Sequence, residues 1–343
     1  MDDVALLAVD GGNSKTDLAL VAGDGTLLAA VRTPGCSHQR LGLAGAMSSL
    51  RSGVAKLRTA AGRSGAYGPA ELGVFCMAGI DLPVDDDRVG AALRGEGFAH
   101  GLEVHNDMFA MLWAGSPAGW GVAVGAGTGL NCVGLAPDGR EVRFPSLGRI
   151  SGDWVAGGRW LGVRALGQAI RAGDGRGEPT ELQRAVPEYF GLSDPMAVAE
   201  AVYTGRIEER SLLALAPTVF KAAAGGDPVA RELIDSVVEE IVNLVGVTVR
   251  RLDLAESAVP VVLGGGLLHS GDGMLLDGVR AGVLEAAPKA EFRVLDAPPV
   301  LGAALFGLAK LGAGPEAAAR LTEQLTYDSL GAVGPAELVE PPA

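Results

Sequence analysis

A polar turn near the start of the sequence combines residue types that could bind a phosphate group. The stretch Asp10–Asp17 reads Asp-Gly-Gly-Asn-Ser-Lys-Thr-Asp between two apolar runs. Its glycines allow the backbone to approach a ligand, and backbone N–H groups in such a turn form a concave anion site. Asp10 could hold Mg²⁺, because this hard cation prefers carboxylate and water oxygens. No Walker A sequence is present, and a plain glycine hairpin is the alternative.

A second glycine-rich turn repeats this layout further along the chain. Trp120–Ala136 contains an apolar run, the turn Gly127-Thr128-Gly129 and another apolar run, and an Asp-Gly hairpin follows, as it does after Leu6–Ala22. Two copies of one strand–turn–strand pattern predict two similar lobes that face each other across a cleft. The alternative is again a hairpin without a ligand, and the presence of two such turns makes it less attractive for both.

Polar residues follow the apolar strands that flank the first turn. Asn106 and Asp107 come after a strand predicted over 101–105, and Gly79 follows another over 71–77. In mixed α/β sheets, ligands bind beyond the carboxyl ends of strands, so we expect Asp10, Gly79 and Asp107 to converge on one cleft. Asp107 also precedes a predicted helix, so the alternative role for Asp107 is the N-cap of that helix.

The remaining pattern predicts an α/β chain with a helical segment in its second half. Three strands are followed by alternating helices and strands, which indicates a mixed sheet. From about 159 to 253 the chain is predicted to be mostly helical, with one helix over 207–224. Pro260–Leu268 is predicted as a buried strand with three glycines that could lie against a purine or ribose. A helix is expected to end near Lys310, and one more could follow Gly312.

Composition excludes several classes of protein. The net charge of −13 argues against a nucleic-acid partner, because phosphate backbones require a basic surface. The three cysteines lie far apart without a CxxC pair, which argues against zinc and against a disulfide framework. The first residues lack the basic region of a signal peptide, and no apolar run is long enough to span a membrane. These features predict a cytoplasmic protein.

A loop dense in glycine is a further candidate site. Residues 148–162 read GRISGDWVAGGRWLG, with Asp153 between a glycine and a tryptophan. Such a loop before a helix is more often a binding site than a connector. A turn or helix N-cap is the alternative for Asp153.

Taken together, these residues resemble the BadF/BadG/BcrA/BcrD-type ATPases of the actin-like, ribonuclease-H-like superfamily, and within that group the N-acetylglucosamine kinases. The resemblance covers nearly the whole chain in order. It implies a two-lobed α/β fold, a duplicated ribonuclease-H-like unit, with a nucleotide cleft between the lobes. The implied divisions are an N-terminal lobe over 1–115, a larger lobe with a helical insertion over 116–312, and a tail over 313–343. The motifs are Asp10–Asp17, Asn106-Asp107, Gly125–Gly129, Gly152-Asp153 with Gly157–Gly162, Leu263–Gly266 and Pro298–Gly307.

The resemblance also implies roles for single residues. Asp107 would accept the proton of a sugar hydroxyl, and Asp10 would organise Mg²⁺. Residues expected to hold the ATP phosphates are Gly12, Asn13, Ser14, Lys15, Thr16, Gly127, Thr128 and Gly129. The nucleoside would face Gly264, Gly265 and Gly266. Residues expected beside the sugar are His38, Gly79, Asn106, Asp107, Thr128 and Asp153.

The implied function is ATP-dependent phosphorylation of a sugar, N-acetylglucosamine to its 6-phosphate, by a homodimer. Two departures from the family pattern leave the sugar open. Trp154 follows Gly152-Asp153 where the family often has Glu, and His38 lies at about the place of a common Asn. A kinase for glucosamine or glucose is therefore an alternative. Others are an iron–sulfur ATPase activator of a 2-hydroxyacyl-CoA dehydratase, whose cluster needs cysteine pairs in loops, and a non-catalytic sugar sensor.

Overall fold

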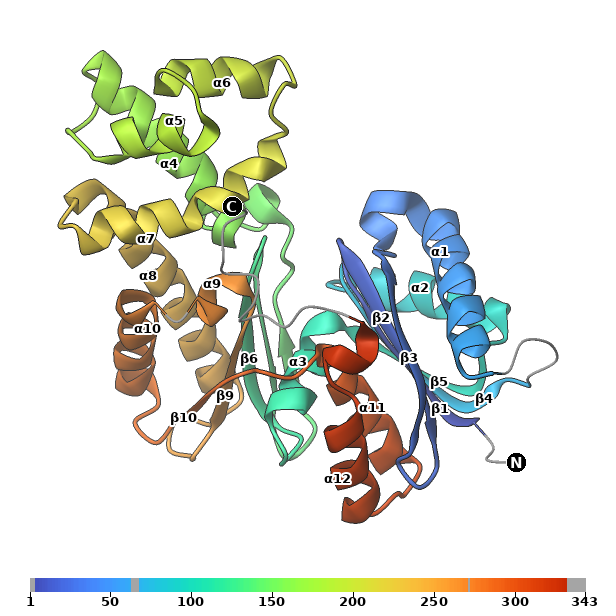
Figure 1. Cartoon of the computed structure of the whole chain (residues 1–343). Coiled ribbons are helices and arrows are strands. Elements are labelled where there is room, and N and C mark those ends of the chain that lie inside the picture. Colours follow the sequence, from blue (N-terminus) through green and yellow to red (C-terminus); the bar gives the residue numbers. More distant parts are fainter. Residues whose placement is uncertain (1–3, 63–67, 271, 332–343) are drawn as a thin grey trace.

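The structure is a computed structural model that describes residues 4–62, 68–270 and 272–331. Two five-stranded sheets form its framework, one in each half of the chain (Figure 1). Within the described ranges, no helix is both long and apolar enough to cross a membrane.

The first sheet has the strand order β3-β2-β1-β4-β5. β1, β2 and β3 form an antiparallel meander, and β4 and β5 run parallel to β1. Helices cover both faces of this sheet. Successive strand residues are therefore apolar, whereas a sheet with one exposed face would alternate apolar and polar residues. On β1, Leu6 and Ala8 enter one core, and Leu7 and Val9 enter the other. The strands are β1 (Val4–Gly11), β2 (Lys15–Ala22), β3 (Leu27–Pro34), β4 (Ala70–Met77) and β5 (Ala99–Asn106).

The second sheet repeats this topology. Its order is β10-β9-β6-β7-β8, with an antiparallel meander of β6, β7 and β8 and two strands parallel to β6. The repeat confirms the duplicated, two-lobed α/β fold that the two glycine turns predict. The strands are β6 (Gly121–Ala126), β7 (Leu130–Leu135), β8 (Glu141–Arg143), β9 (Pro260–Gly264) and β10 (Glu291–Val294).

Two helices cover the outer face of the first sheet, and three lie on its inner face toward the second sheet (Figure 1). The outer pair is α1 (His38–Ala60) and α2 (Pro83–Glu96), and the inner set is α3 (Asp107–Gly115), α11 (Pro299–Lys310) and α12 (Pro315–Gln324). α3 crosses α11 at close range, because a Cβ on Gly302 would lie only 1.9 Å from the Ala110 carbonyl oxygen. α3 also contacts strands of both sheets, so it lies between them.

The segment after the second sheet returns to the first. α11 packs on β1 and β4, and α12 adds to the same core. The backbone N–H of Leu27 donates to the Gln324 side chain at 2.8 Å. The expected boundaries at 115 and 312 remain predictions. The helix expected after Gly312 is present as α12.

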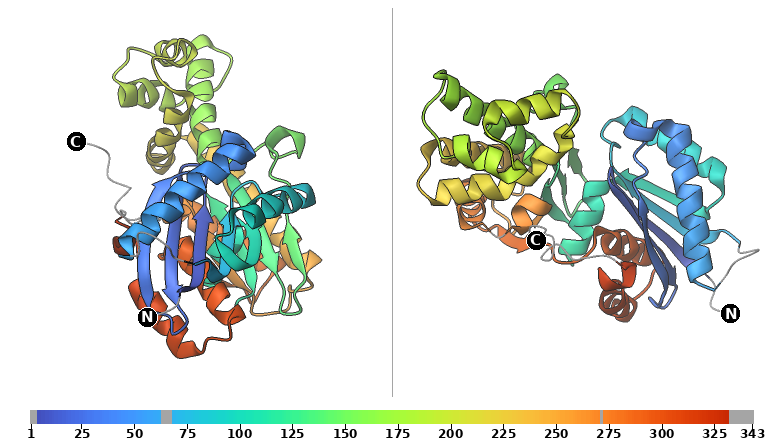
Figure 2. Two further views of the ribbon diagram at one scale, coloured as in Figure 1. Left: turned by 90° about the vertical axis from the view of Figure 1, so that its right-hand side faces the viewer. Right: turned by 45° about the horizontal axis from the view of Figure 1, so that its top comes forward.

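A helical insertion extends the second half beyond one end of its sheet (Figures 1 and 2). α8 packs on β6 and β7, α10 packs on α8, and both helices belong to the largest apolar core. The elements here are η1 (Gly148–Ile150), α4 (Gly157–Asp174), α5 (Leu182–Phe190), α6 (Pro195–Tyr203), η2 (Glu209–Leu215), α7 (Ala216–Ala224), α8 (Pro228–Arg251), α9 (Gly266–His269) and α10 (Gly273–Ala286), and the turn η3 (Asp328–Leu330) follows α12.

Two expected elements are wrong in their extent. The helix expected over 207–224 is instead the 3₁₀ turn η2 followed by α7, because Pro217 in the first turn of α7 has no N–H to continue a helix from η2. The strand expected over 260–268 ends at Gly264. Gly265, at a φ of 89°, turns the chain into α9, a conformation that glycine adopts at no steric cost.

Candidate active site

Strand register brings the predicted carboxyl-end residues to one edge of the first sheet. Gly11 on β1 is opposite Met77 on β4, and Met77 is opposite Asn106 on β5. Two strand spacings, about 10 Å, therefore separate the ends of β1 and β5. Asp10, Gly79 and Asp107 share this edge, as the sequence predicts.

Asp107 is the first residue of α3, and the N-cap is its neighbour. The Asn106 side chain accepts a hydrogen bond from the backbone N–H of Met108 at 2.9 Å. The alternative reading of Asp107 as the N-cap is therefore wrong, because Asn106 already satisfies that backbone donor. This frees the Asp107 carboxyl for another role.

The surroundings of Asp107 favour its protonated form. Burial, together with the negative charges of Asp10 and Asp81, raises the pKa of Asp107 to about 7. Hydrogen bonds from backbone N–H groups oppose this shift only in part. A carboxylate with a pKa near neutrality is suited to accept a proton from a hydroxyl group.

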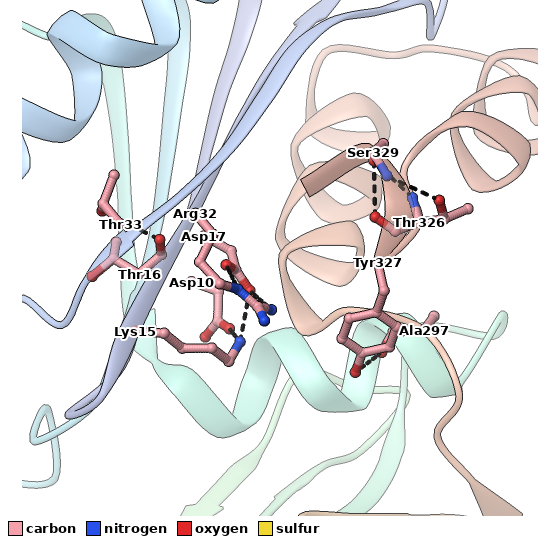
Figure 3. Close-up of polar contacts among 10 residues, drawn as sticks. All are labelled: Asp10, Lys15, Thr16, Asp17, Arg32, Thr33, Ala297, Thr326, Tyr327 and Ser329. Carbon is pink, nitrogen blue, oxygen red and sulfur yellow. Dashed lines mark hydrogen bonds and ion pairs between the residues drawn. The ribbon is translucent and has the colours of Figure 1, made fainter. Parts of the chain in front are cut away.

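An ion-pair cluster surrounds Asp10 at the first turn (Figure 3). Lys15 Nζ lies 2.6 Å from Asp17 and 3.5 Å from Asp10. Arg32 on β3 donates two hydrogen bonds to the fully buried Asp17, at 2.7 and 2.8 Å. Figure 3 also shows Tyr327, beside η3, near this cluster, and its hydroxyl donates to the Ala297 carbonyl at 3.3 Å. Sequence reasoning assigned no role to this C-terminal residue.

The two carboxylates of this cluster are not equally compensated. Burial raises the pKa of Asp10, and Lys15 lowers it only in part. Asp17 instead has both Lys15 and Arg32 as partners. A desolvated carboxylate at the sheet edge fits a Mg²⁺ ion that is held by one or two carboxylates, water and nucleotide phosphates. Asp10 is therefore the residue of this cluster that would hold the metal.

The backbone of the first turn is held by the segment that follows β3. Gly12 N–H donates to the Lys15 carbonyl within the turn, and Cys36 N–H donates to the Gly12 carbonyl. The Arg40 side chain donates to the Asn13 carbonyl. Gly12, Asn13, Ser14 and Lys15 thus form a fixed turn at the sheet edge. The Thr16 side chain is buried within β2, at 1% exposure, away from the surface of the turn.

Three glycine-rich segments meet at the second turn. Gly158 N–H at the start of α4 donates to the Gly127 carbonyl at 2.8 Å, and Arg159 N–H donates to the Thr128 carbonyl at 3.1 Å. A Cβ on Gly157 would lie 2.3 Å from the Gly129 oxygen, and one on Gly265 would lie 2.5 Å from the backbone of Ala126. Only glycines permit this approach. The junction brings together Gly127, Thr128, Gly129, Gly264, Gly265 and Gly266.

Helix α3 connects the two halves of the site. The Met108 side chain packs against Gly125, where a Cβ would lie 3.0 Å from its sulfur. The Met111 side chain packs in the same way against Gly264, where that distance would be 2.7 Å. Asp107 therefore directly precedes a residue that contacts β6, two residues before the second turn. α3 thus carries the general base candidate at its first residue and contacts the second sheet beside the glycine junction.

The other residues expected beside a sugar divide between the lobes. His38 begins α1, and its Nε2 lies 3.5 Å from Asp85 on α2. Gly79, at a φ of 84°, lies against the Gln39 side chain, which leaves no room for a Cβ. Asp153 lies in the second half, where its backbone N–H donates to the Gly148 carbonyl and its carboxylate accepts from Ser151.

Sequence reasoning missed Asp81. This residue follows β4, is 9% exposed, and accepts a hydrogen bond from Asn106 Nδ2 at 2.8 Å. Burial and the charge of Asp85 raise the pKa of Asp81 to about 6, while the Asn106 and Asn131 amides oppose the shift. The available signal was its place after a strand, the same signal that singles out Asp107.

The chain is similar in sequence and structure to proteins that are named as N-acetylglucosamine kinases. An N-acetyl-D-glucosamine kinase of Dictyostelium discoideum is 25% identical over 90% of this chain and 99% of its own. An N-acetylmuramic acid/N-acetylglucosamine kinase of Clostridium acetobutylicum is 26% identical over 58% of this chain and 66% of its own. A crystal structure of a candidate N-acetylglucosamine kinase from Chromobacterium violaceum superimposes with a TM-score of 0.67 at 26% identity, covering 90% of this chain and 100% of that one.

The family assignment rests on a match along most of the chain. The sequence pattern that defines the BadF/BadG/BcrA/BcrD ATPase family matches residues 7–307, which include both glycine turns, Asp107 and all strands except the first three residues of β1. This chain belongs to the BadF/BadG/BcrA/BcrD ATPase family.

Proposed function

We propose that this protein is an ATP-dependent sugar kinase that transfers the γ-phosphoryl group of ATP to the 6-hydroxyl of N-acetylglucosamine. The observation that carries the proposal is the position of Asp107. It is a carboxylate with a pKa raised to about 7, at the end of β5 and directly before the α3 residues that contact the glycine junction. This position supports a role for Asp107 as the base that would meet an acceptor hydroxyl beside a bound phosphate.

Asp107 would accept the proton of the sugar hydroxyl as its oxygen attacks the γ-phosphorus. The bond between the γ-phosphorus and the β–γ bridging oxygen breaks, and ADP leaves with that oxygen. The proton then passes from Asp107 to solvent. Phosphoryl transfer depends mainly on alignment and on charge stabilisation, so the base needs only to be positioned and unprotonated.

The glycine junction would hold the ATP phosphates. Its turn, Gly127–Gly129, accepts hydrogen bonds from backbone N–H groups at the N-terminus of α4. The aligned peptide dipoles of this 18-residue helix give that end a partial positive charge. The first turn, Gly12–Lys15, would contact the phosphates from the opposite lobe. Mg²⁺ bound with the nucleotide would neutralise phosphate charge, and Asp10 would hold it.

The choice of N-acetylglucosamine is supported by what the three relatives are named for. Glucosamine and glucose are the alternatives, because Trp154 and His38 depart from the family pattern beside the expected sugar residues. On the resemblance alone, we extend the proposal to a cytoplasmic homodimer.

The activator of a 2-hydroxyacyl-CoA dehydratase is the second candidate function. Its iron–sulfur cluster needs accessible thiolates. Here burial raises the pKa of Cys36 to about 11 and that of Cys132 to about 12, and it raises the pKa of Cys76 as well. These buried thiols favour the kinase.

ADP release with Mg²⁺ and ATP tests the proposal directly. The panel is N-acetylglucosamine, glucosamine, N-acetylmannosamine, glucose, N-acetylgalactosamine and no sugar. Strong turnover with N-acetylglucosamine alone is the expected result. Equal turnover with every sugar and with none would contradict the kinase and favour an ATPase whose acceptor is water.

A further inference from the structure

An arginine outside the sequence motifs joins the two lobes near the end of β4, where the sugar is proposed to bind. Arg143 lies on β8 of the second sheet, and its guanidinium donates to both oxygens of Asp86 on α2, at 3.0 and 2.8 Å. Asp86 lies on α2, which covers the first sheet. This bidentate pair therefore crosses from one lobe to the other. Arg143 is only 19% exposed at its side chain, which limits screening by solvent.

Arg143 also contacts the segment that supports Asp107. Its Nη1 donates a longer hydrogen bond, 3.4 Å, to the Ile80 carbonyl. The same carbonyl accepts from Asn106 Nδ2 at 3.2 Å. One backbone oxygen is therefore shared between a side chain of the second lobe and the residue that precedes Asp107.

The contacts continue to the start of α3. Asn106 Nδ2 also donates to Asp81 at 2.8 Å, and Asn106 Oδ1 accepts from Met108 N–H. Asn106 is 1% exposed, so no water competes for these partners. The Ile80–Asp81 segment thus fixes the side chain that caps α3 and sets where Asp107 begins the helix.

We propose that Arg143 is a positioning residue: its bond across the lobes to Asp86 and Ile80 couples lobe closure to the placement of Asp107. When the lobes separate, Arg143 leaves the Ile80 carbonyl and Asn106 loses a constraint. Asp107 then reaches its catalytic position only in the closed arrangement. The inference rests on the proposed kinase function, because Asp107 acts as the base only in that reaction.

Four variants test the coupling: Arg143→Gln, Asp86→Asn, the double variant and Arg143→Lys. We expect Arg143→Gln and Asp86→Asn each to lower kcat for the sugar by about ten- to hundredfold, since small displacements of a catalytic group cost that much. The double variant loses no more than Arg143→Gln alone, because Arg143→Gln already removes the bond to Asp86. Arg143→Lys keeps a charge but not the bidentate geometry, so it is intermediate. The KM for ATP changes by less than about twofold.

Arg140→Gln is the matched control. Arg140 lies on the same β7–β8 hairpin, but its ion pairs are with Asp138 and Asp253, both in the second half of the chain. It therefore loses its ion pairs, which are more exposed than that of Arg143, without breaking a contact between lobes. We expect its kcat to equal that of the unaltered protein. Rates are expressed per folded protein, measured by circular dichroism, so that lost stability is not mistaken for lost positioning.

Small-angle X-ray scattering without ligands gives a second readout that does not depend on turnover. The double variant should have a larger radius of gyration than the unaltered protein. An unchanged kcat in Arg143→Gln, losses that multiply in the double variant, or an unchanged radius of gyration would each overturn the coupling. If the unaltered protein phosphorylates no sugar, the proposed function fails, and scattering still decides whether Arg143 holds the lobes together.

Discussion

Replacement of Asp107 by Asn is expected to lower turnover and to raise stability in the same protein. The side chain keeps its size, but it can no longer accept the proton of the acceptor hydroxyl. A general base contributes about 10²–10⁴-fold, so kcat should fall by that factor while ATP still binds. In the unaltered protein, kcat should fall as the pH drops below about 7, because Asp107 then becomes protonated. The variant should lack this dependence.

The expected gain in stability follows from the raised pKa of Asp107. The folded protein binds this proton more tightly than the unfolded chain, so stability is lost as the pH rises from the ordinary value of 3.8 to about 7. One pKa unit corresponds to about 1.4 kcal/mol, which gives a ceiling of about 4 kcal/mol at pH 8. Asp107 is only partly buried as a residue, so solvent screens part of this cost and we expect about half of it, about 2 kcal/mol. Asn carries no such charge and escapes the cost.

Urea unfolding in metal-free buffer and ADP release with N-acetylglucosamine measure the two effects. The stability difference between Asp107→Asn and the unaltered protein should be largest near pH 8 and fall to less than half near pH 5. Asp174→Asn is the control, because Asp174 is an exposed carboxylate paired with Arg176. It should change neither quantity. A variant with near-normal kcat, or one that is no more stable at pH 8, would refute the reasoning.

Three further outcomes are expected. Gly157→Ala should raise the KM for ATP at least tenfold, because its Cβ would lie 2.3 Å from the Gly129 oxygen; Gly175→Ala, at a similar positive φ with open space, should lose stability but keep that KM. Lys15→Met should weaken ATP binding and destabilise the fold by about 1–3 kcal/mol, since Asp17 loses one of its two cationic partners, and calorimetric titration with unfolding curves would show both. The three thiols should react with iodoacetamide at pH 8 only after unfolding, because burial raises their pKa values, and rapid labelling of the native protein would contradict this.

Local sequence patterns were sufficient for most of the fold. Apolar runs on both sides of Asp10–Asp17 and of Gly127–Gly129 predict strand–turn–strand units, because strand period and turn chemistry are properties of neighbouring residues. Their repetition predicts the two lobes, and the order of strands predicts that Asp10 and Asp107 share an edge. The strand order of the two sheets and the register of β1, β4 and β5 confirm both predictions. The end of β9 was predicted too late in the sequence, because the strand and the first turn of α9 form one continuous run of apolar residues and glycines.

The tertiary structure alone decided which partners these residues have. Asn106 rather than Asp107 caps α3, because the strand end of β5 directs its side chain back to the helix and to Asp81. The pair of Arg143 with Asp86 joins residues that are remote in sequence and that no local pattern relates. Sequence determines the elements through neighbouring residues. Burial, charge and side-chain partners depend on which distant segments pack together, and only the folded chain settles that.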